Sequence, residues 1–74
     1  MAEIKYKIYK HIGSISQRNN GWTKELNLIS WNDREPVYDL RTWNDDHTKM
    51  GKGVTITAGE MAELKKILDD MDMF

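Results

Sequence analysis

The sequence contains no cysteine, and its 74 residues include only one proline and five glycines. Without cysteine the chain cannot form disulfides or a thiolate zinc site, and this composition fits a reducing compartment. No apolar run approaches the roughly 20 residues that cross a membrane, and the first ten residues lack the apolar core of a signal peptide. We therefore expect a cytoplasmic protein that does not contact a membrane.

The length of the chain predicts one domain, residues 1–74, whose core only marginally offsets the entropy lost on folding. Domains of this size are usually supplemented by disulfides, a metal ion or a partner chain. His11 and His47 are isolated in the sequence and do not make a metal cage, so we expect no metal and no cofactor. Self-association is therefore the remaining way to stabilise so small a domain.

The two ends of the chain carry opposite charge, although the formal net charge is only −1. Residues 1–30 contain five lysines and arginines against two glutamates, and residues 58–74 contain two lysines against five carboxylates. This asymmetry predicts one basic surface and one acidic surface.

Alternation of apolar and polar residues predicts four strands. They cover residues 4–12, 22–31, 37–43 and 53–57. The first strand begins at Ile4, and the polar cluster that follows it ends in Asn20-Gly21, a strong hairpin signal. Residues 44–53, rich in charged residues and glycine, predict an exposed and mobile loop.

The alternation also separates two sets of side chains. The set expected to face the core contains Trp22, Leu26, Leu28, Tyr38, Leu40, Val54 and Ile56. The opposite set contains Asn27, Ile29, Trp31, Asp39, Arg41 and Trp43. One helix covers one sheet face, and the second set is too apolar for an ordinary wet surface. We expect this outward face to meet a ligand or a partner.

The last segment predicts one amphipathic helix, from about Ala58 to Met71. Thr57 and Glu60 have the spacing of a capping box. Apolar residues recur at three- and four-residue spacing and form a stripe suited to a sheet or a twin helix: Met61, Leu64, Leu68 and Met71. The predicted fold is therefore α+β, an antiparallel four-stranded sheet followed by one helix.

Two motifs could indicate other chemistry, and both are weak. Gly51-Lys52-Gly53 lacks the spacing and the following helix of a phosphate loop, which leaves a flexible hairpin turn or a lysine that contacts phosphate. Asp45, Asp46 and His47 could in principle bind a metal ion. The side chains of adjacent residues rarely converge on one ion, so a solvated loop is favoured. Because so short a chain has little room for a catalytic cleft, we expect no enzymatic activity and no small-molecule substrate.

Trp31 and Trp43 leave two interpretations open. Both rings could fill a dimer interface, where aromatic residues are enriched. Alternatively they form a platform on which bases stack, with cations around it for phosphates: Lys24, Arg34, Arg41 and Lys52. Reading a duplex would instead require a helix for the major groove, and the predicted helix is acidic. Single-stranded nucleic acid fits better.

Three motifs occur in one order along the chain: G-W-T-K-E-L-N-L at Gly21–Leu28, Y-D-L-R-x-W at Tyr38–Trp43, and K-x-G-K-G-V-T-I-T at Lys49–Thr57. Leu64-Lys65 follows in the helix. Together they resemble the single-stranded-DNA-binding domain of the transcriptional coactivator family called positive cofactor four, most closely its short bacterial YdbC-type members. The serine-rich regulatory region of the eukaryotic members is absent, so the resemblance does not imply coactivation.

The resemblance implies a curved antiparallel sheet, a C-terminal helix and a symmetric dimer paired through its helices. It also implies that Trp31 stacks on bases and that Arg34, Arg41 and Lys52 hold the strand. The complete set of predicted nucleic-acid-binding residues is Lys24, Asn27, Trp31, Arg34, Arg41, Trp43, Lys49 and Lys52. The predicted dimer contacts are Met61, Leu64, Leu68 and Met71.

Two functions follow as expectations. The first is non-enzymatic binding of single-stranded DNA, or RNA, by a homodimer with a role in transcription, replication or repair. The alternative is a protein-interaction module in which Ile29, Trp31 and Trp43 bind an extended peptide and the acidic helix binds a basic partner.

Overall fold

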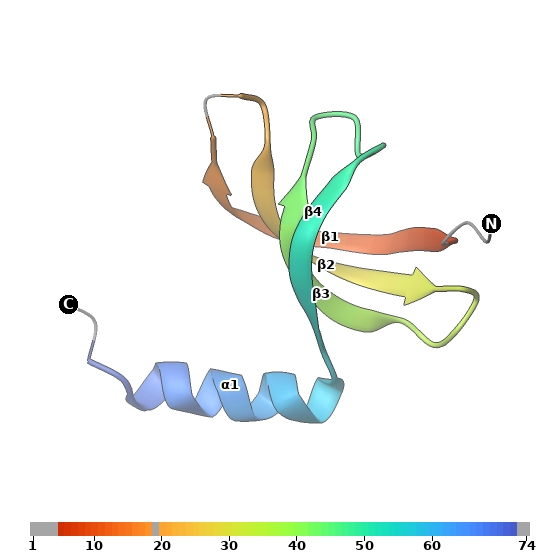
Figure 1. The fold of residues 1–74 in the computed structure, drawn as a ribbon. Helices are drawn as coiled ribbons and strands as arrows, with labels where there is room; N and C mark the ends of the chain where they lie inside the picture. Colours follow the sequence, from red (N-terminus) through yellow and green to blue (C-terminus); the bar gives the residue numbers. More distant parts are fainter. Residues whose placement is uncertain (1–4, 19, 73–74) are drawn as a thin grey trace.

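The computed structural model describes residues 5–18 and 20–72, which form four strands and one helix. The elements follow the order β1 (Tyr6–Gln17), β2 (Thr23–Trp31), β3 (Val37–Trp43), β4 (Met50–Ile56) and α1 (Ala58–Asp70) (Figure 1). Each strand pairs antiparallel with the next, so β1 and β4 are the edges of an open sheet. The predicted α+β class and strand order are confirmed. Ile4 lies outside the described residues, as does Asn19 of the first predicted turn.

The fourth strand begins at Met50, earlier than the sequence predicted, so Gly51 and Gly53 are strand residues and not a flexible turn. A Cβ added at either glycine would come closer than 3.0 Å to β3, to Thr42 at the first and to Arg41 at the second. The two glycines therefore allow β4 to approach β3 where the register shifts.

The turn between β2 and β3 is tight and is held against the start of β1. Asn32 and Asp33 have positive φ angles of 50° and 62°, and the Arg34 N–H donates to the Trp31 carbonyl at 3.0 Å. Positive φ at both central residues is typical of a type I′ hairpin turn. The Asn32 N–H also donates to the Lys5 carbonyl at 2.8 Å. This turn brings the backbone of Arg34 back to that of Trp31, three residues earlier.

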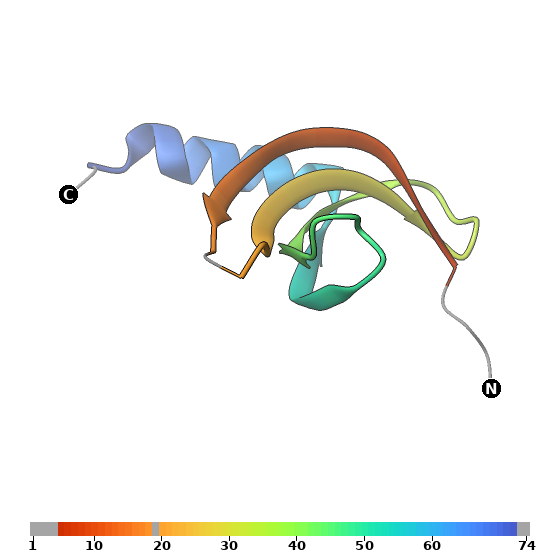
Figure 2. The same cartoon turned by 90° about the horizontal axis from the view of Figure 1, so that it is seen from above.

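The sheet curls strongly. Tyr6 pairs with Trp31 at one end of β2, and Trp43 pairs with Thr23 at the other end. The ends of a straight nine-residue strand lie about 26 Å apart, yet the Tyr6 and Trp43 ring centroids are 5.4 Å apart. The register of β1 shifts three times along β2, and such bulges increase bending and twist. The resulting arch is visible in Figure 2.

The face inside the curl, here called the tryptophan face, carries Trp31 and Trp43. Its other members on β2 and β3 include Glu25, Asn27, Ile29, Asp39 and Arg41. Ile29 and Trp43 have no exposed surface and are the buried hydrophobic residues of the described chain. The core of the single chain therefore lies on the face that the sequence analysis assigned to a ligand or partner.

The face outside the curl, here called the leucine face, carries Leu26, Leu28, Tyr38, Leu40, Val54 and Ile56. None of these six residues is buried, and Val54 is 53% exposed. The expectation that they form the core of the chain was wrong, because the curl encloses the opposite face instead.

Helix α1 begins and ends close to the predicted residues. Both hydrogen bonds of the capping box are present: the Glu60 N–H donates to Thr57 Oγ1 at 3.1 Å, and the Thr57 N–H donates to Glu60 Oε1 at 2.9 Å. The helix buries none of its residues, its main contact is with β3, and it extends away from the sheet in Figure 1. The expectation that the helix covers one sheet face is therefore wrong for the single chain.

Candidate nucleic-acid interface

The accessible part of the tryptophan face is built around a stack of Trp31 and Arg41. The guanidinium carbon of Arg41 lies 4.9 Å from the Trp31 ring centroid. Arg41 is fixed by Asp39, because its Nε donates to Oδ1 at 2.6 Å and its Nη2 donates to Oδ2 at 2.9 Å. Asp39 has no exposed surface and the Arg41 side chain is 15% exposed. This two-pronged ion pair holds the guanidinium plane over the ring and neutralises its charge.

Trp43 lies beneath this surface, between the rings of Tyr6 at 5.4 Å and His47 at 5.5 Å. Because Trp43 has no exposed surface, its ring offers no open side for a base and instead supports the face from within. The indole N–H groups of Trp31 and Trp43 are buried without an acceptor among the described residues. A buried donor left without an acceptor costs about 1–3 kcal/mol.

A buried polar layer adjoins the two tryptophans and contains Asn27, one of the predicted site residues. Glu25 is 4% exposed and Asn27 is fully buried. The Glu25 carboxylate accepts hydrogen bonds from Thr23 Oγ1, from Asn27 Nδ2 at 3.2 Å and from His47 Nε2 at 2.9 Å. His11 Nδ1 lies 2.7 Å from Asn27 Oδ1 and 3.4 Å from Glu25 Oε1.

The ionised form of Glu25 is favoured despite burial. Burial raises the pKa of the carboxyl group, but hydrogen bonds from Thr23, His47 and Asn27 together outweigh it and hold the pKa below its ordinary value of 4.5. His11 and His47, which look isolated in the sequence, therefore meet at one buried carboxylate. No local spacing signals this, because the three residues come from β1, β2 and the loop before β4.

The loop between β3 and β4, residues 44–49, makes several hydrogen bonds within itself and to β1. The Asn44 N–H donates to the Lys49 carbonyl at 3.1 Å, and the Lys49 N–H donates to Asn44 Oδ1 at 2.9 Å. The Tyr6 hydroxyl donates to the His47 carbonyl at 2.7 Å. Lys49 is thereby presented at a defined position.

The predicted solvated character of this loop holds for Asp45 and Asp46, which are exposed. The Thr48 hydroxyl donates to Asp46 Oδ1 at 2.6 Å and lowers the pKa of that carboxyl group. His47, by contrast, turns toward the sheet. Residues 5–18 and 20–72 contain no group of three metal-ligating side chains placed to hold an ion.

The predicted cations differ in exposure. Arg34, Lys49 and Lys52 are exposed. Lys24 is half-buried, and its position between Thr23 and Glu25 places it in phase with the leucine face. The structure therefore does not bring Lys24 together with Trp31 as the sequence analysis expected.

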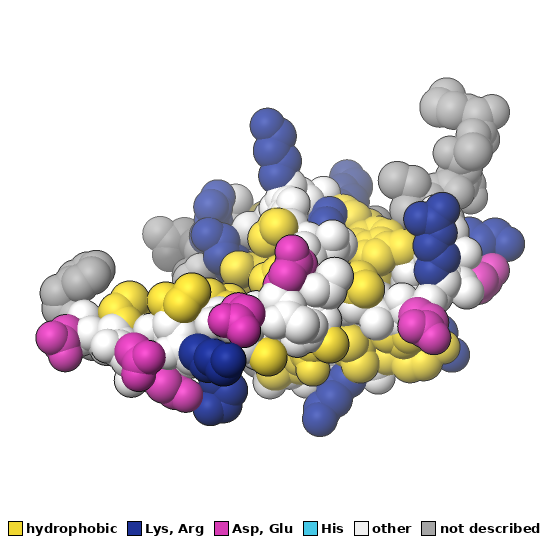
Figure 3. Space-filling view, turned by 90° about the horizontal axis from the view of Figure 1, so that it is seen from below, with side chains coloured by type: hydrophobic (Ala, Val, Ile, Leu, Met, Phe, Trp, Pro, Cys, Tyr) yellow, Lys and Arg dark blue, Asp and Glu magenta, His cyan; other side chains and the backbone are white. Residues whose placement is uncertain are grey.

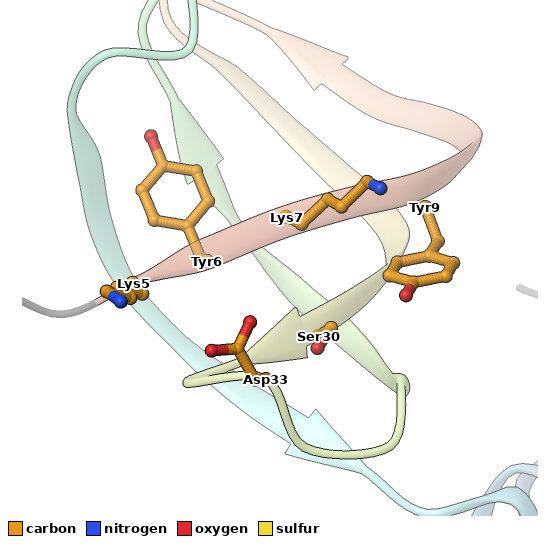
Figure 4. Close-up of a pocket in the computed structure, with 6 residues that line it drawn as sticks. All are labelled: Lys5, Tyr6, Lys7, Tyr9, Ser30 and Asp33. Carbon is orange, nitrogen blue, oxygen red and sulfur yellow. The ribbon is translucent and has the colours of Figure 1, made fainter.

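The start of β1 adds two lysines that the sequence analysis missed, Lys5 and Lys7. Figure 4 shows the pocket of about 550 Å³ that they line beside the β2–β3 turn, together with Tyr6, Tyr9, Ser30 and Asp33. Lys7 Nζ lies 5.1 Å from the Tyr9 ring centroid. The alternation of lysine and tyrosine in this strand was the available signal for a second basic and aromatic surface.

Three of the four predicted dimer residues, Met61, Leu64 and Leu68, lie on α1, and Met71 is the C-cap that follows it. Leu64, Leu68 and Met71 are 37%, 49% and 40% exposed. Met61 is half-buried and closes a groove of about 420 Å³, whose other lining residues are Lys10, Ile12, Leu26, Leu28 and Tyr38. Figure 3 shows hydrophobic side chains reaching the surface beside the acidic groups of the helix. No helix in the described part of the chain is long and apolar enough to cross a membrane.

Comparison with known proteins found a matching family model and a similar protein. The family model described as Transcriptional Coactivator p15 (PC4) matches residues 18–67, which contain β2, β3, β4 and most of α1. A protein of Treponema pallidum (strain Nichols), described as uncharacterized, is 42% identical over 71 residues, which cover 96% of this chain and 84% of that protein. The PC4 family is non-enzymatic and binds single-stranded DNA. The chain belongs to the PC4 family of transcriptional coactivator p15 domains.

Proposed function

We propose that this protein is a homodimer that binds single-stranded nucleic acid, DNA or RNA, without enzymatic activity, in transcription, replication or repair. The observation that carries the proposal is the Trp31–Arg41 stack, followed in the next turn by exposed Arg34, in a family that binds single-stranded DNA. Unpaired bases offer flat π-faces and their backbone offers phosphates, so a single strand requires aromatic surface and cations side by side.

Within this proposal, Arg41 contributes its flat surface more than its charge. A phosphate would have to compete with the buried carboxylate of Asp39, which already occupies Nε and Nη2. The exposed residues Arg34, Lys49 and Lys52 form no ion pair with the described residues. They are therefore the better candidates for phosphate contacts.

The homodimer is proposed from the apolar surface that the chain leaves uncovered. The helix stripe of Leu64, Leu68 and Met71 is exposed beside a groove on the leucine face. Exposed patches of this kind mark interaction sites, and a stripe on a single helix suits a two-fold contact in which the same patch meets itself. A second copy would cover both the stripe and the groove.

The decisive experiment compares variants in a salt titration of poly-dT binding. Trp31→Ala should weaken binding by about 1–3 kcal/mol at every salt concentration, because a stacking surface is lost. Lys52→Ala should reduce the log–log salt slope by about 0.7, because one phosphate contact is lost. Arg41→Ala should weaken binding and leave the slope unchanged. Lys66→Ala, which removes an exposed lysine from α1, is the matched control and should change neither.

Circular dichroism checks that each variant is folded, and poly-U, duplex DNA and an unrelated extended peptide serve as competitors. Competition by single strands and not by the duplex supports the proposal. If folded Trp31→Ala binds poly-dT as tightly as the wild type, the stacking surface is wrong. Preferential binding of the peptide would favour the protein-interaction alternative.

A further inference from the structure

His11 on β1 and His47 in the β3–β4 loop approach the same buried carboxylate, that of Glu25 on β2. His11 Nδ1 and His47 Nε2 lie 3.4 Å and 2.9 Å from Glu25 Oε1. The left-handed backbone of His47, with φ of 60°, is uncommon for a residue other than glycine. Hydrogen bonds from the Tyr6 hydroxyl and to Glu25 hold it there. The position of His47 is therefore specified by the fold.

The hydrogen-bond network determines which ring nitrogens carry the protons. Asn27 Nδ2 donates to Glu25 Oε1, so Asn27 Oδ1 faces His11 and accepts from its Nδ1–H at 2.7 Å. An ionised carboxylate only accepts hydrogen bonds, so the nitrogen of His47 that faces Glu25, Nε2, carries a proton. In the neutral state the remaining nitrogens, His11 Nε2 and His47 Nδ1, each present a lone pair.

These two remaining nitrogens make no hydrogen bond to the described residues, and the side chains of His11 and His47 are 52% and 38% exposed. A phosphate diester oxygen is an acceptor, so a neutral histidine offers it no donor at these positions. Protonation places an N–H on both nitrogens and turns both into charged donors. Histidine is the side chain that makes this change between about pH 5 and 8.

We propose that His11 and His47 form a phosphate-binding position on the tryptophan face that is completed by proton uptake when a single strand binds. In this position, the Nε2–H of His11 and the Nδ1–H of His47 donate to backbone phosphate. The inference rests on the proposed function and adds a condition to it, because affinity becomes linked to pH.

The charges around the two histidines favour phosphate binding when the rings are protonated. From β2 they face Glu25, whose negative charge would repel a phosphate while both imidazoles are neutral. On β3, Asp39 and Arg41 pair with Asn27 and Glu25 in the strand register and form an ion pair with each other that carries no net charge. Two protonated imidazoles convert the cluster with Glu25 from a net negative to a net positive charge.

The remaining neighbours do not supply a competing partner. Tyr6 is occupied by the His47 carbonyl. In the loop, Asp46 is engaged by Thr48, while Asp45 and Lys49 are exposed. Glu25 is therefore the carboxylate that both rings contact.

Proton uptake can be counted by calorimetry. A dT oligonucleotide is titrated into the wild-type protein at pH 7 and constant ionic strength, in two buffers that differ in ionisation enthalpy. The difference in apparent binding enthalpy between the two buffers, divided by the difference in their ionisation enthalpies, gives the number of protons taken up. We expect a positive number, and an affinity that falls between pH 6 and 8 by at most about tenfold per pH unit for each proton.

The matched controls separate this inference from the proposed function. The double variant His11→Gln/His47→Gln should still bind dT, with no proton uptake and a flat pH profile. An uncharged methylphosphonate oligonucleotide should bind the wild type without proton uptake, which keeps the test decisive even if the double variant does not fold. Binding of dT with no proton uptake by the wild type overturns the inference and leaves the proposed function standing. Absence of dT binding at every pH overturns both.

Discussion

The two faces of the sheet differ in how deeply they bury their side chains. The tryptophan face encloses charged and amide groups, with Glu25, Asn27 and Asp39 each less than 5% exposed. The leucine face is apolar and yet buries none of its six named residues. A chain selected only to be stable by itself would do the reverse, because burial favours apolar groups and penalises polar ones. This difference supports the proposal that the tryptophan face binds nucleic acid and that a second copy covers the leucine face.

The largest expected effect comes from comparing the same substitution, isoleucine to alanine, on the tryptophan face and on the exposed helix. Ile29→Ala removes a fully buried side chain of the tryptophan face and should lower the free energy of unfolding by about 2–5 kcal/mol. Ile67 on α1 is 60% exposed. Ile67→Ala should therefore change the free energy of unfolding by less than about 0.5 kcal/mol where subunits are dissociated. Denaturant unfolding at low protein concentration measures both. Equal losses would mean that the core has been assigned to the wrong face.

The next effect concerns self-association. Leu64 is 37% exposed in the single chain, and Leu64→Asp would place a charge in the proposed contact. It should weaken the dimer by about 2 kcal/mol or more, as expected for a central interface residue. Ala62→Asp adds the same charge to the opposite side of the helix and should leave the dimer intact. Sedimentation at micromolar concentration is the measurement, and a monomeric wild type would contradict the homodimer.

The number and order of the strands, the helix and the assignment of residues to two faces could be predicted because their signals are local, whereas the end of β1 and the start of β4 were not predicted. Alternation located β3, and the Thr57–Glu60 capping box located the start of α1. The direction of burial could not be predicted, because it depends on the curl that three register shifts in β1 produce. The contacts of His11 and His47 with Glu25 were equally out of reach, because they exist only after strands distant in the sequence have paired.

A smaller effect tests why glycine occupies the strand that follows the loop. Gly53→Ala would force a Cβ into the Cβ of Arg41 and the carbonyl of Leu40, and should destabilise the protein by about 1–3 kcal/mol. An added Cβ at Gly59, in the first turn of α1, meets nothing within 4 Å. Gly59→Ala should therefore stabilise by about 0.4–1 kcal/mol. Thermal unfolding measures both, and tolerance of Gly53→Ala would favour a flexible turn.

The smallest effect is the pH dependence of stability that Glu25 confers. The pKa of Glu25 is lowered in the folded state. Its contribution to the free energy of unfolding is therefore fully present above its ordinary pKa of 4.5 and is lost as the pH falls below that value. The stability difference between wild type and Glu25→Gln should therefore shrink below this pH. Urea unfolding across pH 3 to 7 measures it, and a constant difference would show that the carboxylate is not stabilised by its partners.

The most direct test of the division between the two faces is a nuclear magnetic resonance titration with a dT oligonucleotide. The chain has three tryptophans, so three indole N–H signals can be followed together with the backbone amides of α1. Binding on the tryptophan face should shift the Trp31 indole and the amides around Arg34, while those of Leu64 and Leu68 stay in place. Shifts along Leu64 and Leu68 with an unmoved Trp31 indole would place the nucleic acid on the leucine face and contradict the assignment.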